Sequence, residues 1–352
     1  MKIGYYPRYD RLGASSRHRF FNYVERWLHD ESAGLENVIY PGLSDKYLQK
    51  LYRAGKVGKL DLFIEMAKLF RRACFTACDA MVIEYELMPD LPYTWERKLI
   101  GNRPYILNYD DNVWVKYNHK PLLKNKFDAL CRSAAGVIVA NKFLQEKISQ
   151  LNPKVCMIPT AVDLAAYKRN NLPKFEDFTL VWIGTPVTYK YLEQHLGILQ
   201  TVSRQLDCTL LIVADKRLEK QRPLSGVKAR YVDWSPDSEA EYLLKSHVGI
   251  MPLTDDEFSR GKSAFKLLQY QAAGLPLIAS PIGENNQVVT EGVNGFLAQS
   301  GEEWLQAVKS LRSDSALYCR LAAGAQLKAQ EYSLEKYLPV FQNFILDSFR
   351  KS

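Results

Sequence analysis

This sequence of 352 residues has no long apolar run and no cysteine spacing typical of a metal site, and we expect no secretion signal. No apolar run approaches the ~18 residues that a membrane-spanning helix needs. The first residues, MKIGYYP, are typical of a strand and not of a signal peptide. These absences predict a cytoplasmic protein whose thiols are reduced.

The cysteines also lack the spacing of a metal site. Cys74 and Cys78 lie one helical turn apart, but neither a second pair nor a histidine cluster follows them. We therefore expect these cysteines to be small core residues that bind no metal. His18 stands alone in an amphipathic segment and is expected to be structural. The cysteines are Cys74, Cys78, Cys131, Cys156, Cys208 and Cys319.

An excess of acidic residues is absent too. The formal net charge is +8, which favours anionic partners such as nucleotides, phospholipid surfaces or nucleic acid without choosing among them. Hydrophobic residues make up 47% and charged residues 24%, as in a normal soluble globular protein. A chain of 352 residues is too long to fold around one ordinary hydrophobic core, so we expect two domains.

Short apolar runs alternate with amphipathic helical stretches along nearly the whole chain. The alternation pauses at residues 160–178, TAVDLAAYKRNNLPKFEDF, a polar stretch typical of a domain junction. We expect an N-terminal domain over 1–165, a C-terminal domain over 166–332 and a final helix over 333–352 that packs on either domain. Strands are predicted at residues 2–6, 37–40, 80–84, 104–109, 135–140 and 155–159, and again at 179–184, 208–215, 228–234, 247–253 and 275–280.

Strands that alternate with helices favour parallel sheets packed between helices. Two such runs joined by a linker predict an α/β protein of two Rossmann-like, doubly wound domains that face a central cleft. In open α/β sheets ligands bind at the carboxyl ends of the strands, so we expect the ligand in that cleft.

Residues 56–75, KVGKLDLFIEMAKLFRRACF, form a cationic amphipathic helix by their pattern. Such a helix lies on anionic lipid in some proteins. The alternative is an exterior helix with an apolar stripe toward the core.

Two lysines open the most informative stretch, GKSAFKLLQY, which begins at Gly261. We expect one helix to span it, so that Lys262, Lys266, Gln269 and Tyr270 share a helix face. Cations are disfavoured at a helix N-terminus, and like charges four residues apart repel. A bound anion such as a nucleotide phosphate would offset both unfavourable interactions, and Gly261 would let this anion approach the backbone.

The alternative is neutralisation of these lysines by the acidic residues just upstream, Asp255, Asp256 and Glu257.

From Val248 to Leu297 the chain reads VGIMPLTDDEFSRGKSAFKLLQYQAAGLPLIASPIGENNQVVTEGVNGFL. This stretch resembles the donor-binding region of family-4 retaining glycosyltransferases of the GT-B fold. After the polar stretch 160–178 the alternation resumes with WIGTPVTYKYLEQHLGIL, which is similar to the first strand, glycine loop and helix of their C-terminal domain. GASSRHRFFNY, EYELMPDLPYTWE, LNYDDNVW and VIVANKFL are similar to a branch of bacterial surface-polysaccharide transferases. The resemblance omits the 56–75 segment and the final helix.

The resemblance places the family's Glu-x7-Glu pair on Gly261 and Gln269, so both carboxylates are missing. It implies that Gln269 holds the nucleotide ribose, because an amide both donates and accepts hydrogen bonds. In the family the first glutamate lies near the donor sugar. Because Gly261 replaces it, the identity of the sugar stays undetermined. Lys262 or Lys266 would stabilise the diphosphate leaving group in the transition state. The same motif places Gly283 and Asn285 in the donor site.

Further donor contacts are expected from three loops that follow predicted strands. Gly184, Thr185 and Lys190 resemble the family's phosphate-contacting loop. Trp234 lies where the family's nucleobase-binding loop falls. The alternative is that Trp234 is an edge aromatic residue that only packs. The loop that holds Gly13, Ser15 and Arg17 can present backbone N–H groups to phosphate or acceptor, and the alternative is that Ser15 and Ser16 are helix N-caps.

The acceptor side is expected in the first domain. Asp110 and Asp111 follow a strand and can orient or deprotonate an acceptor hydroxyl, or else cap the next segment. Glu86 and Arg17 are further acceptor candidates, and the alternative for Glu86 is a loop carboxylate in water. Asp111 is favoured over Asp110 as the catalytic group.

The resemblance thus implies a hexosyltransferase that uses a nucleotide-diphosphate sugar, needs no metal or other cofactor, and acts with retention in cell-surface polysaccharide biosynthesis. Its partners would be the donor, a glycan or lipid-linked acceptor, and anionic lipid at the inner face of the membrane, but no nucleic acid. Two alternatives stay open. One is another GT-B activity, a nucleotide-sugar epimerase or phosphorylase. The other is a non-catalytic GT-B partner in an assembly complex, which the missing carboxylates favour.

Overall fold

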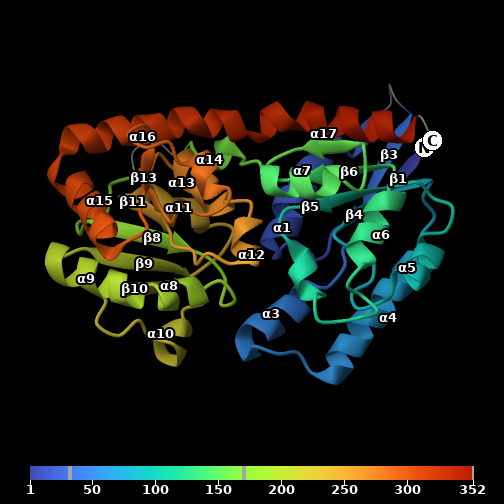
Figure 1. Ribbon diagram of the computed structural model, residues 1–352, viewed down its shortest axis with the longest axis horizontal. Helices are drawn as coiled ribbons and strands as arrows, with labels where there is room; N and C mark the ends of the chain where they lie inside the picture. The colour runs from blue at the N-terminus through green and yellow to red at the C-terminus, as the bar shows by residue number, and fades with distance from the viewer. Residues whose placement is uncertain (31–33, 169–171, 351–352) are drawn as a thin grey trace. The chain divides into compact units, whose positions relative to one another are not determined.

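The structure is a computed structural model that describes residues 1–30, 34–168 and 172–350 (Figure 1). Part of the predicted junction, 169–171, and the last two residues of the predicted final helix lie outside the described residues. The chain divides into two compact units. The first comprises Met1–Ala161, Gly261–Ser263 and Leu334–Ser352, and the second comprises Val162–Arg260 and Ala264–Ser333.

The first unit is built on a seven-stranded sheet of order β2-β3-β1-β4-β5-β6-β7. Its strands are parallel except β2, which pairs antiparallel with β3. The strands predicted in this half are all present, and β2 was not predicted. Their bounds are β1 (Lys2–Tyr6), β2 (His29–Asp30), β3 (Leu35–Ile39), β4 (Ala80–Glu84), β5 (Tyr105–Tyr109), β6 (Gly136–Val139) and β7 (Val155–Met157).

Helices cover both faces of this sheet because successive strand residues point to opposite sides. Val82, Ile106 and Ile138 pack with the segment after β1 and with α17, whereas Met81 and Leu107 pack with α4 to α7. The helical segments are α1 (Ala14–Ser16), the π-helix η1 (Arg17–Phe21), α2 (Asn22–Val24), η2 (Glu25–Trp27), α3 (Asp45–Ala54), α4 (Lys59–Phe75), α5 (Tyr93–Ile100), η3 (Val113–Lys116), α6 (Lys126–Ser133), α7 (Lys142–Ser149) and α17 (Leu334–Phe349).

The final helix, α17, belongs to the first unit by its contacts. The ring of Phe341 lies 4.7 Å from that of Tyr23 in α2. Gly136, at the start of β6, is needed under this helix, because an added Cβ would come within 2.8 Å of the Phe344 ring.

The second unit is built on a six-stranded parallel sheet of order β10-β9-β8-β11-β12-β13. The strands predicted in this half are all present, and β13 is added. Their bounds are β8 (Thr179–Ile183), β9 (Thr209–Ala214), β10 (Ala229–Asp233), β11 (Val248–Met251), β12 (Leu277–Ala279) and β13 (Gly295–Leu297). The helical segments are η4 (Leu164–Tyr167), α8 (Lys190–Gln194), α9 (Leu196–Leu206), α10 (Leu218–Gln221), α11 (Glu239–Lys245), α12 (Glu257–Arg260), α13 (Phe265–Ala272), α14 (Asn285–Val288), α15 (Gly301–Ser313), α16 (Ser315–Ala329) and η5 (Gln330–Tyr332).

Each unit is therefore a doubly wound α/β layer structure, which confirms the predicted fold class (Figure 1). The strand order of the second unit is that of the Rossmann fold, and it reverses between β8 and β11. In the first unit the order reverses between β1 and β4. Ligands of such sheets bind outside the carboxyl ends of the strands at these reversal points. The loops after β1, β4, β8 and β11 are thus where the functional residues are to be sought.

None of the helices in the described part of the chain is both long enough and apolar enough to cross a bilayer.

Candidate functional site

The two lysines that the sequence placed on one helix are separated by a break in the chain. Helix α12 ends at Arg260, and α13 begins at Phe265. Between them Ala264 adopts a left-handed conformation with φ of 52°. The prediction that Lys262 and Lys266 repel each other within one helix is therefore wrong. A single left-handed residue interrupts the helical hydrogen bonds, and alanine gives no signal of it.

Lys262 and Gly261 belong to the first unit by their contacts. Lys262 is 9% exposed, and its Nζ lies 3.7 Å from Oδ2 of Asp111. The carbonyl oxygen of Gly261 accepts a hydrogen bond from Nδ2 of Asn141 at 2.9 Å. An added Cβ at Gly261 would lie 2.4 Å from Cβ of Asn112, so only glycine fits there. Gly261 thus allows a close packing of the chain on itself.

Lys266 lies in the second unit, in the first turn of α13. Its side chain is half-buried, and its Nζ lies 5.7 Å from the ring centre of Trp182 in β8. Of the upstream acidic residues, Asp255 pairs with Arg260, and Asp256 accepts a hydrogen bond from the N–H of Ser259. These contacts do not support neutralisation of Lys266 by Asp255 or Asp256.

The loop after β8 is a tight turn that needs its glycine. A Cβ at Gly184 would lie 2.3 Å from the Trp182 ring. The N–H of Thr185 donates to Oγ1 of Thr188, so this turn is closed on itself. Lys190 begins α8 as an exposed side chain, and its Nζ lies 5.0 Å from the ring centre of Tyr191.

Gly283 lies in the loop after β12, and Asn285 is the first residue of α14. Gly283 has φ of 55°, and a Cβ there would lie 2.5 Å from the carbonyl oxygen of Arg260. Asn285 is 1% exposed and its Nδ2 donates to the carbonyl of Ser280 at 2.9 Å. Both residues shape the loop beside the end of α12, and their role toward a donor stays a prediction.

A cluster that the sequence did not predict joins Gln269 and Trp234. Nε2 of Gln269 donates to Oε1 of Glu239 at 2.5 Å, and Nε1 of Trp234 donates to Oε2 of the same carboxylate at 2.6 Å. The hydroxyl of Tyr167 lies 3.4 Å from both Glu239 and Gln269. Trp234 and Gln269 are thus brought together through a residue that no motif singled out.

In the first unit, the loop after β1 meets the ends of β4 and β5. Oγ of Ser15 donates to Oδ2 of Asp110 at 2.6 Å, and the Tyr85 hydroxyl donates to Oδ1. Oγ of Ser16 donates to Oε2 of Glu84 at 2.5 Å. The alternative that these serines cap the helix is wrong, because the N-cap of α1 is Gly13 and makes no side-chain hydrogen bond.

Gly13 and Arg17 flank these serines. A Cβ at Gly13 would lie 2.5 Å from Cβ of Tyr9, so the glycine permits the turn after β1. NH1 of Arg17 donates to the carbonyl of Arg11, and NH2 lies 3.2 Å from Nε2 of His18. His18 is 9% exposed.

The adjacent aspartates have different surroundings. Asp110 is 6% exposed and both of its carboxylate oxygens accept hydrogen bonds, whereas the Asp111 side chain is 26% exposed and faces Lys262. Neither one caps the next segment, since the N-cap of η3 is Asn112. Asp111 is thus the more exposed of the two aspartates.

Glu84 is the residue of this region that sequence reasoning missed. It is 1% exposed and ends β4, and its Oε1 is buried without a hydrogen-bond partner among the described residues. Burial, and then Asp110, raise the pKa of its carboxyl to about 7. The signal was present in the sequence, because a charged residue directly follows the apolar run AMVI.

Glu84→Gln is expected to flatten the pH dependence of stability. Because the folded-state pKa of about 7 lies above the ordinary 4.5, the folded protein holds a proton that the unfolded chain releases. Stability then falls as pH rises between these values, by up to about 3 kcal/mol at 1.36 kcal/mol per pKa unit. Thermal unfolding at pH 5 and pH 8 measures the change in wild type and variant. Glu146→Gln, which changes an exposed carboxylate of α7, is the control. Equal pH dependence in Glu84→Gln and wild type would contradict the argument.

Glu86 is a buried ion-pair residue, so the alternative of a loop carboxylate in water is wrong. Its oxygens lie 2.9 Å from Arg8 NH1, 3.0 Å from Lys116 Nζ and 2.7 Å from Lys126 Nζ. Burial opposes the charged form, but Lys126, Arg8 and Lys116 lower its pKa to about 2. Lys126 also pairs with Glu96 at 2.7 Å, and both side chains are fully buried.

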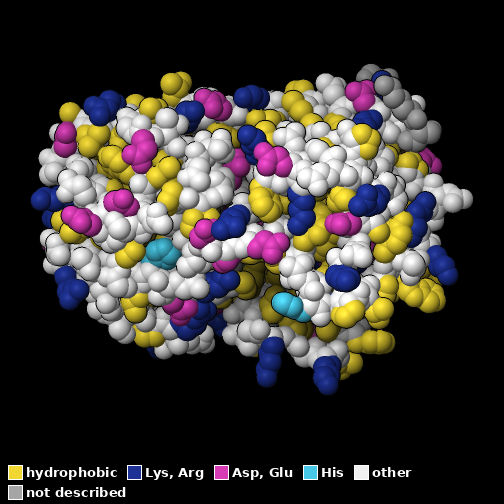
Figure 2. All heavy atoms as spheres, viewed as in Figure 1, with side chains coloured by type: hydrophobic (Ala, Val, Ile, Leu, Met, Phe, Trp, Pro, Cys, Tyr) yellow, Lys and Arg dark blue, Asp and Glu magenta, His cyan; other side chains and the backbone are white. Residues whose placement is uncertain are grey.

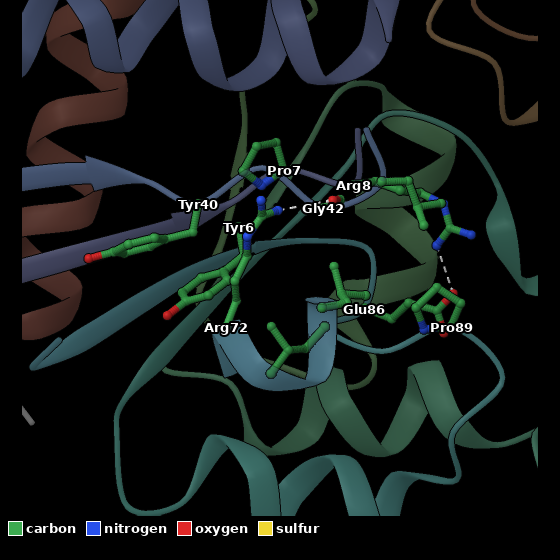
Figure 3. A pocket seen from close by; sticks show the side chains of 11 residues that line it. Tyr6, Pro7, Arg8, Tyr40, Gly42, Arg72, Glu86 and Pro89 are labelled. Atoms are coloured by element: carbon green, nitrogen blue, oxygen red, sulfur yellow. Dashed lines mark hydrogen bonds and ion pairs between the residues drawn. The ribbon is translucent and has the colours of Figure 1, made fainter. Parts of the chain in front are cut away.

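A small pocket of the first unit borders this cluster (Figure 3). Arg8 points toward Glu86 on one side, and on the other Arg72 donates to the carbonyl of Gly42 at 3.2 Å. Both arginines are thus engaged within the unit. The pocket is lined by Tyr6, Pro7, Arg8, Tyr40, Gly42, Leu43, Leu69, Arg72, Glu86, Leu87 and Pro89.

Helix α4 carries apolar side chains on its outer face as well as its inner one. Leu69 and Ala73 are buried against the sheet, as the alternative of a core-facing stripe requires. Leu60, Phe63 and Phe70 are nevertheless 72%, 70% and 49% exposed. In Figure 2 hydrophobic and basic side chains mix over the region where Figure 1 shows α4.

A family model described as glycosyl transferases group 1 matches residues 177–314. The second unit carries a glycosyltransferase domain. The match spans the loops after β8 and β11, with Gly184, Lys266 and Gln269, and also the Trp234 and Glu239 cluster. It confirms the predicted enzyme class, a glycosyltransferase.

Solved glycosyltransferase structures share the fold over essentially the whole chain. Sucrose-phosphate synthase from Thermosynechococcus elongatus has a TM-score of 0.70 at 14% identity, with 100% of each chain covered. HepE from Anabaena in complex with UDP-glucose has 0.72 at 14%, covering 99% of this chain and 100% of that one. A glycosyltransferase from Rickettsia africae has 0.64 at 13%, covering 100% and 99%. These similarities confirm the GT-B fold of this glycosyltransferase. A comparison of the sequence with curated proteins found no match.

Proposed function

We propose that this glycosyltransferase moves a sugar from a nucleotide-diphosphate sugar to a glycan or lipid-linked glycan acceptor. We further propose that it acts with retention, in cell-surface polysaccharide biosynthesis. The observation that carries the proposal is the group 1 domain match, which includes both loops at the strand-order reversal of the second unit. The neighbour HepE was solved with UDP-glucose, so UDP is the first donor fragment to test.

The donor diphosphate is proposed to bind in the second unit, at Lys266. This ammonium group lies in the first turn of α13, whose free N–H groups also favour an anion. A cation placed there disperses the charge that develops on the leaving diphosphate. The reaction is proposed to need no metal ion, because this lysine supplies the positive charge.

Lys266→Ala is expected to weaken UDP binding by at least about tenfold, as loss of a hydrogen bond to a charged group predicts. Unfolding should change little, because the Trp182 contact of a half-buried lysine is worth only about 0.5–1 kcal/mol. Calorimetry with UDP, GDP, ADP and dTDP, in excess chelator, measures the affinity. Lys309→Ala, at an exposed lysine of α15, is the control.

Normal binding by a destabilised Lys266→Ala variant would show that Lys266 is structural. Loss of wild-type binding or transfer in chelator would contradict metal independence.

The acceptor hydroxyl is proposed to be activated in the first unit by Asp111. The Asp111 side chain, two residues after β5, is 26% exposed, whereas Asp110 is 6% exposed. Turnover without added acceptor would indicate an epimerase instead. Donor binding without any turnover of acceptor glycans would favour a non-catalytic partner.

Peripheral contact with an anionic bilayer is proposed to occur through the outer face of α4. Leu60, Phe63 and Phe70 follow one helical stripe, and Lys59 and Lys68 lie on its two sides. Apolar side chains flanked by basic ones are what a helix in the headgroup region requires. Such contact suits a lipid-linked acceptor.

The double variant Phe63→Ser/Phe70→Ser is expected to lose most of the binding to phosphatidylglycerol vesicles. Both rings are largely exposed, at 70% and 49%, so folding should be nearly unchanged. Burying each ring contributes about 1.5–3 kcal/mol, so the vesicle affinity should fall by at least tenfold. Co-sedimentation with phosphatidylglycerol and with phosphatidylcholine vesicles measures it. Leu327→Ser, at a leucine of α16 that is 73% exposed, is the control. Equal binding by the variant and wild type would exclude α4 as the membrane surface.

A further inference from the structure

Glu84, the last residue of β4, ties the segment after β1 to the sheet. One of its oxygens, Oε2, accepts hydrogen bonds from the backbone N–H of Arg8 at 2.6 Å and from Oγ of Ser16 at 2.5 Å. The same Ser16 oxygen accepts from the N–H of Tyr9 at 3.0 Å. Arg8 follows β1, and Ser16 ends α1. A single carboxyl oxygen thus holds both ends of the loop that contains Gly13.

The second oxygen of Glu84 favours a protonated carboxyl. Glu84 is 1% exposed, and Oε1 is buried without a hydrogen-bond partner among the described residues. A buried charge that lacks partners is far more costly than a buried neutral acid. Burial, and then the neighbouring carboxyl of Asp110, accordingly raise the pKa of Glu84 to about 7.

The charged groups around Glu84 come from three elements. On the loop after β1, the guanidinium of Arg8 belongs to the ion-pair cluster described above. On η1, Arg19 donates to Oδ1 of Asn108, which is the β5 partner of Glu84 in the sheet. Asp110 directly follows β5. Among the described residues no cation forms an ion pair with Glu84, so none offsets Asp110 by direct contact.

The same elements orient Asp110. Oγ of Ser15 in α1 donates to its Oδ2 at 2.6 Å, and the hydroxyl of Tyr85, which follows Glu84, donates to its Oδ1. Tyr85 has φ of 61°, an uncommon and strained conformation for so bulky a residue. The strained turn aims the Tyr85 hydroxyl at Asp110. Both segments that hold Asp110 are therefore anchored at Glu84, and the next residue is Asp111.

We propose that Glu84, in its protonated form, is a positioning residue of the acceptor site, where it holds Asp110 in the arrangement that orients Asp111. Loss of this proton places a second buried negative charge beside Asp110 and disturbs that arrangement. The inference rests on the proposed function, because it takes Asp111 to activate the acceptor. A competing explanation is that Glu84 only stabilises the first unit.

The proton itself is tested on the full chain without substrate. A protonated carboxyl has an infrared C=O stretching band that a carboxylate lacks, and spectra between pH 5 and pH 9 follow it. Wild type is expected to lose one such band with a midpoint near pH 7, and Glu84→Gln should lack this band. Glu146→Gln, at a side chain that is 67% exposed, is the control and should keep it.

The positioning role is tested by sugar transfer from UDP-glucose to glycan acceptors at pH 6 and pH 8. Wild-type turnover should fall about tenfold between them, as one proton with a pKa of about 7 predicts. In Glu84→Gln the two rates should agree within about twofold, because an amide does not ionise. Ser16→Ala should move the decrease to higher pH, since the Ser16 hydroxyl stabilises the charged form of Glu84.

The inference is overturned if wild type shows no band that titrates near pH 7, a result that does not depend on any variant. It is also overturned if Glu84→Gln keeps the wild-type ratio of turnover at pH 6 and pH 8, since Glu84 would then only support stability. Should Glu84→Gln fail to fold, an unchanged pH profile in Ser16→Ala contradicts the role. Failure of wild type to transfer sugar at any pH would overturn the proposed function and the positioning role with it, even where the infrared band is present.

Discussion

Lys126→Met is expected to destabilise the first unit by about 3–5 kcal/mol, the cost of removing one partner of a buried ion pair. Nζ of Lys126 lies 2.7 Å from both Glu86 and Glu96, and all three side chains are buried. Glu86 keeps Arg8 and Lys116 as partners after the substitution. Glu96 keeps the backbone N–H groups of residues 87 and 88, so a buried negative charge is left without this cation.

Urea unfolding of the full chain, followed by the transition of the first unit, measures this loss. Lys120→Met is the control, because Lys120 pairs with Asp90 and both side chains are about half exposed, at 51% and 55%. That substitution should change the free energy of unfolding by less than about 1 kcal/mol. The double variant Lys126→Met/Glu96→Gln should recover part of the stability. A loss below about 1 kcal/mol for Lys126→Met would show that the cluster is not a stabilising network.

Asp111→Asn is expected to lower turnover by about 10²-fold, the typical contribution of a general base. The donor affinity should stay within about twofold, because an interaction made mainly in the transition state affects kcat and not ground-state binding. Asp110→Asn should behave differently. Its carboxylate is 6% exposed and accepts from Ser15 and Tyr85, so its loss should lower stability as well as activity.

Sugar transfer from UDP-glucose to glycan acceptors and UDP binding are measured separately for each variant. Asp90→Asn is a suitable control, since Asp90 is exposed and has φ of 59°, a conformation that asparagine also tolerates. Wild-type transfer by Asp111→Asn would remove Asp111 from the mechanism. If Asp111→Asn instead loses donor affinity and turnover together, its ion pair with Lys262 shapes the donor site.

The predicted strands were recovered because their sequence signal is local. Strands buried on both faces need continuous apolar runs, such as TLLIVA of β9 and AMVI of β4. The missed strands β2 and β13 lack such a run, because β2 is the polar pair HD and β13 is GFL, which begins with a glycine. The break before α13 was also missed, because it falls at Ala264, whose left-handed conformation is unexpected for a residue type that favours helices.

The sequence by itself determined the alternation of strands and helices, the two doubly wound units and the enzyme class, because burial pattern and motif spacing are properties of neighbouring residues. Tertiary structure alone decided which charges and amides meet. Glu86 and Lys126 are 40 positions apart, and Glu239 and Gln269 are 30 apart, each pair on different elements. Polar residues recur throughout a chain, so their type carries no information on the partner. The arrangement of strands and helices in the folded units decides which polar residues meet.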